Sequence, residues 1–377
     1  MVQKRLFAPG PTPIPPEALA AMARPIIYHR SPEFEAVQAE VREGLKEVFQ
    51  TQNEVILLAA SGTGAMEAAV VNTLARGDRA LVIRGGKFGE RWGEICKGHG
   101  VPFEAIDVEW GKAVEPGRVA DALRRYPDIR AVLATHSETS TGVLHDIQPV
   151  ADIVRPTPAV LVADCVTSLG VTDVRTDAWG LDVVVAGSQK ALMIPPGLAF
   201  CTLSEKAWAA AARSDLPKFY FNLAAERKSL LKNQNAFTPA VSLVVALKET
   251  LARIRAEGLP NVFARHERLA AATRAGVQAL GCELFAERPG LACTAATPPA
   301  GISASPIVKS LRADHGITIA GGQDRLKGKI FRISHMGYVD GTDIVAVIGA
   351  LERTLARLGA PIRLGDGVRA AQEILLK

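Results

Sequence analysis

Between residues 50 and 205, short continuous apolar runs alternate with stretches of helical periodicity. The runs are β-branched or leucine-rich, and they lack the polar alternation of a strand with one face in water. Such runs are typical of strands buried on both faces, with helices packed above and below a parallel sheet. The pattern therefore predicts an α/β fold with a mostly parallel sheet. The expected strands are Val55–Ala60, Ala80–Ile83, Ala131–Thr135, Ala159–Ala163, Val183–Ala186 and Leu198–Leu203, and the expected helices between them are Ala65–Ala75, Phe88–His99 and Val119–Arg125.

The pattern changes past residue 240, where long stretches with apolar residues at three and four spacing predict helices over Ser242–Glu257, Asn261–Leu280 and Thr342–Leu358. Shorter strand-like pieces, Leu291–Ala296 and Lys329–Ser334, lie between them. We therefore expect a large domain over residues 21–255 and a smaller α+β domain over residues 256–377. The proline-rich start, residues 1–20, cannot begin as a regular helix or central strand, and we expect it to lie across another surface.

Composition narrows the class of protein. The chain has 377 residues, of which 48% are hydrophobic, and no apolar run approaches the ~20 residues needed to cross a bilayer. Prolines interrupt the N-terminus before a signal-peptide core forms, so we expect a soluble cytoplasmic protein that has no membrane partner. Five scattered cysteines without a CxxC pair argue against disulfides and a metal site. A net charge of +5, spread along the chain, argues against nucleic acid as a partner.

Four polar motifs follow predicted strands, at the sheet edge where ligands bind in open α/β folds. Ser61-Gly62-Thr63-Gly64 stands between a strand and a helix, as either a phosphate cradle or an ordinary glycine turn. Asp164 ends an apolar strand, as a buried carboxylate or a helix cap. Lys190 follows another strand, as a nucleophilic amine or a lysine that snorkels to water. The hydroxyl-rich stretch 135–142 could form a turn or hold a ring substituent.

Together the four motifs are more specific than any one alone. A phosphate cradle, a carboxylate and a lysine 26 residues later match the needs of pyridoxal 5'-phosphate (PLP). Its aldehyde requires an amine, its pyridinium nitrogen an anion, and its phosphate the amino end of a helix.

The chain resembles the class V aminotransferases, which have the fold-type I architecture of PLP-dependent transferases, and within them the alanine–glyoxylate and serine–pyruvate group. The resemblance extends from near the N-terminus to about residue 340. It is strongest in GSQKAL preceded by DxVxSLG. The matching stretches are Ala8–Thr12 (APGPT), Ser61–Glu67 (SGTGAME), Glu138–Gly142 (ETSTG), Asp164–Gly170 (DCVTSLG), Gly187–Leu192 (GSQKAL) and Phe331–Gly337 (FRISHMG).

The resemblance implies roles for individual residues. Lys190 is expected to bond the cofactor aldehyde and to move the proton at the substrate Cα, and Asp164 to pair with the pyridine nitrogen. Arg332 is expected to grip the substrate carboxylate as a bidentate fork, with backbone groups of Gly10 beside it, so that residues 1–20 cross the active-site region. The remaining contacts to PLP are assigned to Ser61, Gly62, Thr63 and Gln189 at the phosphate, Phe88 stacked on the ring, Ser140 at its hydroxyl side and Val166 beneath it.

The sequence departs from the family pattern at the phosphate. Eukaryotic members have a histidine where Thr63 stands, and a tyrosine from the partner subunit reaches the phosphate. The corresponding stretch here, residues 233–239, contains no tyrosine, and Asn235 and Thr238 are the candidates for that contact. The resemblance therefore implies a homodimer whose active sites contain residues of both subunits.

The implied activity is transfer of an amino group from a small α-amino acid, alanine or serine, to glyoxylate or another small 2-oxo acid. Ureidoglycine-type, aminoethylphosphonate-type and aspartate–glyoxylate transaminases remain open. A desulfurase-like lyase would need a reactive cysteine, for which Cys293 stands at a suitable distance but inside a strand-like run. A catalytically silent accessory subunit on the same fold is the alternative outside enzymes. Acidic donors would require basic residues such as Arg325, Lys327 and Lys329 to fold inward.

Overall fold

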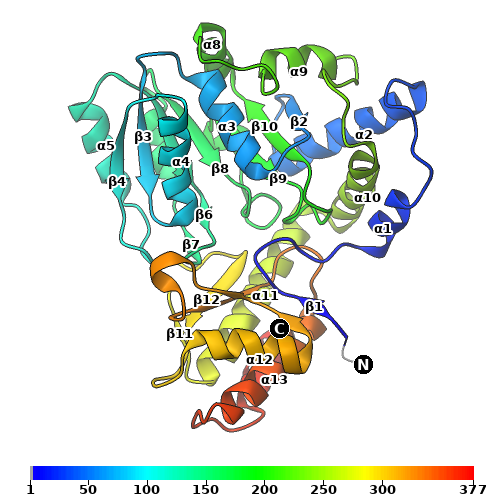
Figure 1. Cartoon of the computed structure of the whole chain (residues 1–377), viewed down its shortest axis with the longest axis vertical. Coiled ribbons are helices and arrows are strands. Elements are labelled where there is room, and N and C mark those ends of the chain that lie inside the picture. Colours follow the sequence, from blue (N-terminus) through cyan, green and yellow to red (C-terminus); the bar gives the residue numbers. More distant parts are fainter. Residues whose placement is uncertain (1–2) are drawn as a thin grey trace.

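The computed structural model describes residues 3–377 and contains a central seven-stranded sheet (Figure 1). The strand order is β2-β10-β9-β8-β5-β3-β4, and every neighbouring pair is parallel except the two that β10 makes. The predicted α/β architecture with a mostly parallel sheet is confirmed. The strands are β2 (Val55–Leu58), β3 (Arg79–Arg84), β4 (Phe103–Asp107), β5 (Ile129–Thr135), β8 (Val160–Asp164), β9 (Val183–Gly187) and β10 (Ala199–Leu203).

Strand β4 was not expected from the sequence. It lies at the sheet edge, and only Ile106 within it is fully buried, so it lacks the continuous apolar run that marks the other strands. The antiparallel direction of β10 was not expected either. It follows from the short connection of eleven residues, 188–198, between β9 and β10, which contains no crossover helix.

Both faces of the sheet are covered by helices, as continuous apolar strands require. Along β9, Val184 packs into the core on one face, and Val183 and Val185 pack into the core on the other. The helices of this region are α2 (Pro32–Phe49), α3 (Gly62–Thr73), α4 (Lys87–Gly98), α5 (Pro116–Arg125), α6 (Ile147–Val154), α7 (Thr176–Trp179), α8 (Glu205–Arg213), α9 (Leu223–Leu230) and α10 (Val241–Glu257).

The C-terminal part is built on a four-stranded antiparallel sheet with the order β11-β12-β15-β14 and has its own apolar core. In Figure 1 it lies below the large sheet. A domain boundary near residue 256 remains our prediction. The elements are α11 (Leu259–Ala279), β11 (Glu283–Leu284), β12 (Cys293–Thr297), α12 (Ala304–His315), β13 (Ile317–Thr318), β14 (Ala320–Gly321), a 3-10 turn (Asp324–Leu326), β15 (Phe331–Ser334), α13 (Gly341–Arg357) and α14 (Asp366–Leu375).

The N-terminal segment joins the two parts of the molecule. Strand β1 (Arg5–Leu6) pairs with β13, and Phe7 is buried in the C-terminal core. The chain then crosses toward the large sheet, where α1 (Pro16–Met22) begins at a proline and lies beside α10 (Figure 1). The prolines between β1 and α1 therefore occupy a connecting segment, where their missing N–H groups leave no gap in a hydrogen-bonded ladder.

All five cysteines are buried and unpaired, and burial raises the pKa of the Cys96, Cys165 and Cys282 thiols to about 12. Within residues 3–377 no cluster of three or more histidine, cysteine, aspartate or glutamate side chains is arranged to hold a metal ion. No helix in the same range has the length and apolar character required to span a membrane.

Candidate active site

The polar motifs meet at one edge of the large sheet. Asp164 is the last residue of β8, and Lys190 follows β9 after a short turn. Strand β2 runs in the same direction as β9, because β10 lies antiparallel between them, so Ser61 emerges at that edge too. The carboxyl ends of these strands therefore bring together motifs that are more than a hundred residues apart in the sequence.

The meeting point is a cavity lined by most of the predicted site residues. The predicted residues that line it are Ser61, Gly62, Thr63, Phe88, Asp164, Val166, Gln189 and Lys190. The residues that the sequence analysis did not assign are Met66, Arg91, Ser137, Thr139 and Thr167. Gly10, Ser140, Asn235, Thr238 and Arg332 do not line this cavity.

Asp164 is buried, and its carboxylate accepts a 2.9 Å hydrogen bond from the backbone N–H of Val166. Burial, opposed by this hydrogen bond, raises the pKa of Asp164 to about 6. The nearby charges of Lys190 and Arg91 act in the opposite direction from burial. A carboxylate held at this depth would gain greatly from a cationic partner in the cavity, as a protonated pyridine nitrogen would be.

Burial lowers the pKa of Lys190 to about 8, so roughly a tenth of its amine is uncharged at pH 7. Its Nζ donates a hydrogen bond to the carbonyl of Pro9. The backbone of Gly10 has a φ of +115° and passes so close to this side chain that a Cβ there would overlap it. Thr12 fixes the segment by donating a 2.8 Å hydrogen bond to the carbonyl of Lys190. The N-terminal segment thus crosses the active site against Lys190.

The amino end of α3 fits a phosphate group. Ser61 precedes the helix, and its side chain forms no capping hydrogen bond, so its hydroxyl remains available for a ligand. A Cβ at Gly62 would lie 2.8 Å from Val166, so only glycine allows this approach of helix and loop. The Oε1 atom of Gln189 is buried without a hydrogen-bond partner in the described chain. An orphaned polar atom at this point is consistent with a bound polar group, and the residues fit PLP.

Helix α4 brings Phe88 and Arg91 to the cavity from the other side. The Arg91 guanidinium lies 5.0 Å from the centre of the Phe88 ring and donates a 3.1 Å hydrogen bond to the Thr63 hydroxyl. The sequence analysis identified Phe88 and missed Arg91. The available signal was spacing, because residues three apart on a helix share a face.

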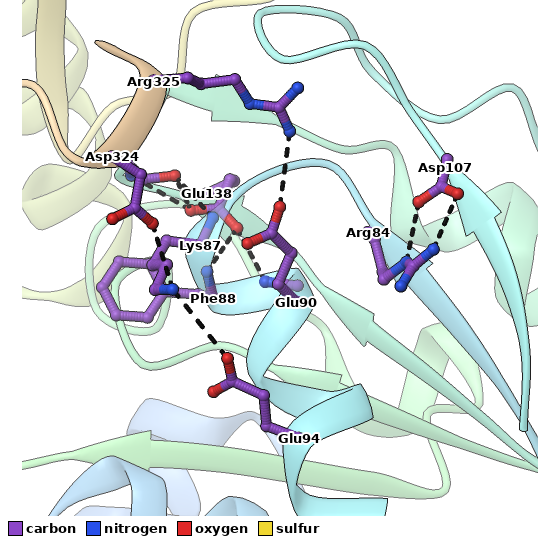
Figure 2. A network of polar contacts seen from close by, with 11 residues as sticks. Arg84, Lys87, Phe88, Glu90, Glu94, Asp107, Glu138, Asp324 and Arg325 are labelled. Atoms are coloured by element: carbon purple, nitrogen blue, oxygen red, sulfur yellow. Dashed lines mark hydrogen bonds and ion pairs between the residues drawn. The ribbon is translucent and has the colours of Figure 1, made fainter. Parts of the chain in front are cut away.

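The amino end of α4 is anchored by Glu138, a fully buried carboxylate (Figure 2). Glu138 accepts hydrogen bonds from the backbone N–H groups of Phe88 and Gly89 at 3.0 and 2.9 Å. The Ser140 hydroxyl donates a 2.5 Å hydrogen bond to Glu138 and accepts one from the Lys87 N–H. The expected place of Ser140 was at the hydroxyl side of the ring. The structure instead gives its hydroxyl to this anchor, and Thr139, the residue before it, lines the cavity.

Arg332 lies on β15 with 6% of its surface exposed. Its guanidinium donates two hydrogen bonds to the carbonyl of Gly321, at 3.0 and 2.8 Å, and a third to the carbonyl of Thr139, at 2.7 Å. Neutral carbonyls thus occupy a fork whose geometry suits a carboxylate. Its charge lies near enough to Lys190 to help lower the pKa of that amine, although burial is the larger cause.

Asn235 and Thr238 lie between α9 and α10, away from the cavity of their own chain. Asn235 is buried and accepts a 2.8 Å hydrogen bond from Gln38, whereas Thr238 is exposed. Their predicted contact with a phosphate would have to be made in a neighbouring subunit.

Cys293, the thiol that a desulfurase-like lyase would use, is on β12 and 2% exposed. Burial raises its pKa to about 11, although the neighbouring charges of Arg332 and Lys190 oppose this. A protonated thiol fixed in a strand of a sheet is a poor nucleophile.

The fold is that of the fold-type I PLP-dependent transferases. Residues 6–346 match the sequence model of the Aminotransferase class-V family. The chain belongs to the class V aminotransferase family, and it is an enzyme, an aminotransferase.

Known proteins are similar to this chain over nearly its full length. The small subunit of the soluble hydrogenase of a Synechococcus strain is 47% identical, with 98% of each chain covered. The L-aspartate–glyoxylate aminotransferase of Paracoccus denitrificans is 41% identical, with 98% of this chain and 96% of that one covered. The crystal structure of the ureidoglycine–glyoxylate aminotransferase of Bacillus subtilis superposes with a TM-score of 0.95 at 29% identity, with 100% of this chain and 99% of that one covered.

Proposed function

We propose that this aminotransferase uses PLP to move an amino group from a small α-amino acid, alanine or serine, to glyoxylate or another small 2-oxo acid. The observation that carries the proposal is the single cavity into which Lys190, Asp164 and the amino end of α3 converge. When bound, PLP supplies an aldehyde for the amine and a ring that withdraws electrons from the substrate Cα.

The residues of the chain have separate tasks in this proposal. The lowered pKa of Lys190 leaves part of its amine free to act as a nucleophile and then to take up and return the proton at the substrate Cα. Asp164 keeps a proton on the pyridine nitrogen. Arg332 orients the substrate by its carboxylate, which replaces the Gly321 carbonyl in the fork.

A preference for small donors is supported by the position of the basic loop around the 3-10 turn. Arg325, Lys327 and Lys329 are exposed, and none of them lines the cavity. Arg325 pairs with Glu90 at 3.4 Å, as Figure 2 shows, and lies 4.1 Å from the centre of the Trp110 ring. These contacts hold its cation outside, so a second carboxylate of the donor has no partner in this loop.

Aspartate is a second candidate donor, because the Paracoccus relative is named for that activity. This candidate requires a cation that reaches the donor side chain. Arg91 lines the cavity and is one such cation. Arg325 would have to leave Glu90 and Trp110 to be another, and the partner subunit is a third source.

The preferred amino donor can be identified by half-reaction kinetics. PLP-loaded protein is mixed with alanine, serine, aspartate or glutamate, and conversion of the cofactor to its amine form is followed by absorbance. We expect alanine and serine to be at least about tenfold faster, in kcat/KM, than either acidic donor, a difference of ~1.4 kcal/mol in transition-state binding. Faster reaction with aspartate would overturn the preference. Arg325→Gln then tests the loop. If this variant loses the reaction with aspartate and keeps the reaction with alanine, Arg325 is the residue that binds the side-chain carboxylate of aspartate.

We further propose that the active form is a homodimer. An aromatic cluster lies beside the segment that carries Asn235 and Thr238: Phe219 and Tyr220 contact Phe237 with ring centres 5.6 and 5.1 Å apart. Phe219 is 82% exposed in the single chain, an unusual position for a phenylalanine. Association of two copies at this surface would bury the cluster and carry Thr238 toward the other active site.

Sedimentation measures this directly. We expect a mass near twice the 40.0 kDa of one chain, and we expect Phe219→Asp to weaken association at least about tenfold, because it places a charge in an apolar contact. Leu376→Asp is the matched control, since Leu376 is 87% exposed at the far end of the chain. A wild-type monomer at micromolar concentration, or an equal effect of both variants, would contradict the proposed surface.

A further inference from the structure

Arg91 is the one cavity-lining residue whose charge has no assigned task. It extends from α4, and its Nη1 reaches the hydroxyl of Thr63 in the turn before α3. Its position is fixed on two sides, by that hydrogen bond and by the ring of Phe88. Its charge is one of the smaller causes, behind burial, of the pKa shifts of both Asp164 and Lys190. Arg91 therefore lies close to both of these groups.

Arg91 forms no ion pair with any residue from 3 to 377. The carboxylates on its own helix are directed elsewhere: Glu90 toward Arg325 at 3.4 Å, and Glu94 toward Lys87 at 4.0 Å. A half-buried guanidinium without a carboxylate is unfavourable unless an anion joins it, because its lost hydration is only partly replaced by one neutral hydroxyl. The structure thus presents a free cation toward the cavity.

The cradle at α3 lacks a charge of its own. Ser61, Gly62, Thr63 and Gln189 offer hydroxyls, backbone N–H groups and an amide, all of them neutral. A phosphate ester carries about −1.5 to −2 charges at neutral pH. A helix terminus provides only about half a positive charge, so it balances only part of the charge of such a group.

We propose that Arg91 is the cation that binds the cofactor phosphate, acting from within the same subunit beside Thr63. This inference rests on the proposed use of PLP. Arg91 would supply the positive charge that the residues of the cradle lack. Cofactor affinity would then depend on the phosphate group through Arg91.

The test measures cofactor affinity, independent of activity. Full-length protein freed of cofactor is titrated with PLP and with pyridoxal, which has the same aldehyde and ring but no phosphate. We expect Arg91→Gln to weaken PLP binding by about 10- to 100-fold, in the range of a charged hydrogen bond, and pyridoxal binding by less than about threefold. Arg91→Lys should lie between the wild type and Arg91→Gln for PLP, because it keeps the charge without the fork.

The matched control is Lys97→Gln, which removes one positive charge from the exposed face of the same helix and should leave both affinities unchanged. Equal losses for PLP and pyridoxal in Arg91→Gln would show a packing role, and no loss would show no role. Unchanged PLP affinity with a selective loss of acidic donors would show that Arg91 binds the substrate. Each of these results overturns the assignment. A wild-type protein that binds neither compound instead overturns the proposed function.

Discussion

Lys190→Ala is expected to lower kcat by at least about 10³-fold, the largest effect of any single substitution in this chain. In the proposed function, the change removes both the amine that bonds the cofactor aldehyde and the base that moves the substrate proton, a role typically worth 10²–10⁴-fold by itself. Lys190→Arg keeps a positive charge near the carbonyl of Pro9 and should be equally inactive, because a guanidinium stays protonated. Transamination rates and the visible absorbance of the loaded protein measure both variants.

Covalent labelling tests the same residue without kinetics. Borohydride treatment of the PLP-loaded wild type, followed by peptide mapping, should fix the cofactor on Lys190. Lys218 is an internal comparison, since its amine is also partly buried, with a lowered pKa, and lies outside the cavity. Label on Lys218 or on any other lysine would refute the assignment of Lys190.

Asp164→Asn is expected to retain part of the PLP affinity while kcat falls by about 10²- to 10³-fold, or ~3–4 kcal/mol of barrier. The amide has nearly the shape of the carboxylate and can still accept the 2.9 Å hydrogen bond from Val166. It cannot stabilise a proton on the pyridine nitrogen, and the neutral ring takes up less charge from the substrate Cα. Single-turnover rates with saturating donor isolate this loss from any change in binding.

Asp182→Asn is the matched control for burial. Asp182 is also buried, and its carboxylate accepts hydrogen bonds from the N–H of Leu161 and the hydroxyl of Ser204. It lies just before β9, at the sheet edge opposite the active site. Asp182→Asn should lower the stability and leave the rate per folded site unchanged. Comparable rates for wild type and Asp164→Asn would mean that another group pairs with the ring nitrogen.

The sheet and the main site motifs could be predicted because they depend on local signals. Runs such as Val183–Ala186 are buried on both faces, so their composition alone marks them as strands. The carboxyl ends of parallel strands share one edge, so Asp164 and Lys190 could be brought together without knowledge of the strand order. The same reasoning did not predict strand β4, because an edge strand needs no continuous apolar run.

The rest of the site depends on contacts between distant segments. Nothing in the sequence near Arg91 shows that Thr63 will lie 3.1 Å from it, because the order of the strands in the sheet decides which helices pack side by side. Ser140 was placed at the ring by resemblance, but the buried carboxylate of Glu138 binds its hydroxyl. The exposure of Thr238 depends on whether a second chain covers it, so its role remains a prediction.

The burial of every cysteine has a practical consequence for studying this protein. Thiol reagents are attacked by the thiolate, and in the folded chain the five sulfurs are both shielded from solvent and held protonated by their raised pKa values. Colour from an aromatic disulfide reagent will therefore develop only through molecules whose cores have opened. At a low reagent concentration, where the cores close faster than the reagent reacts, the rate reports the free energy of opening under native conditions. Opening of the unmodified chain can thus be measured through its own cysteines, without denaturant and without an introduced cysteine.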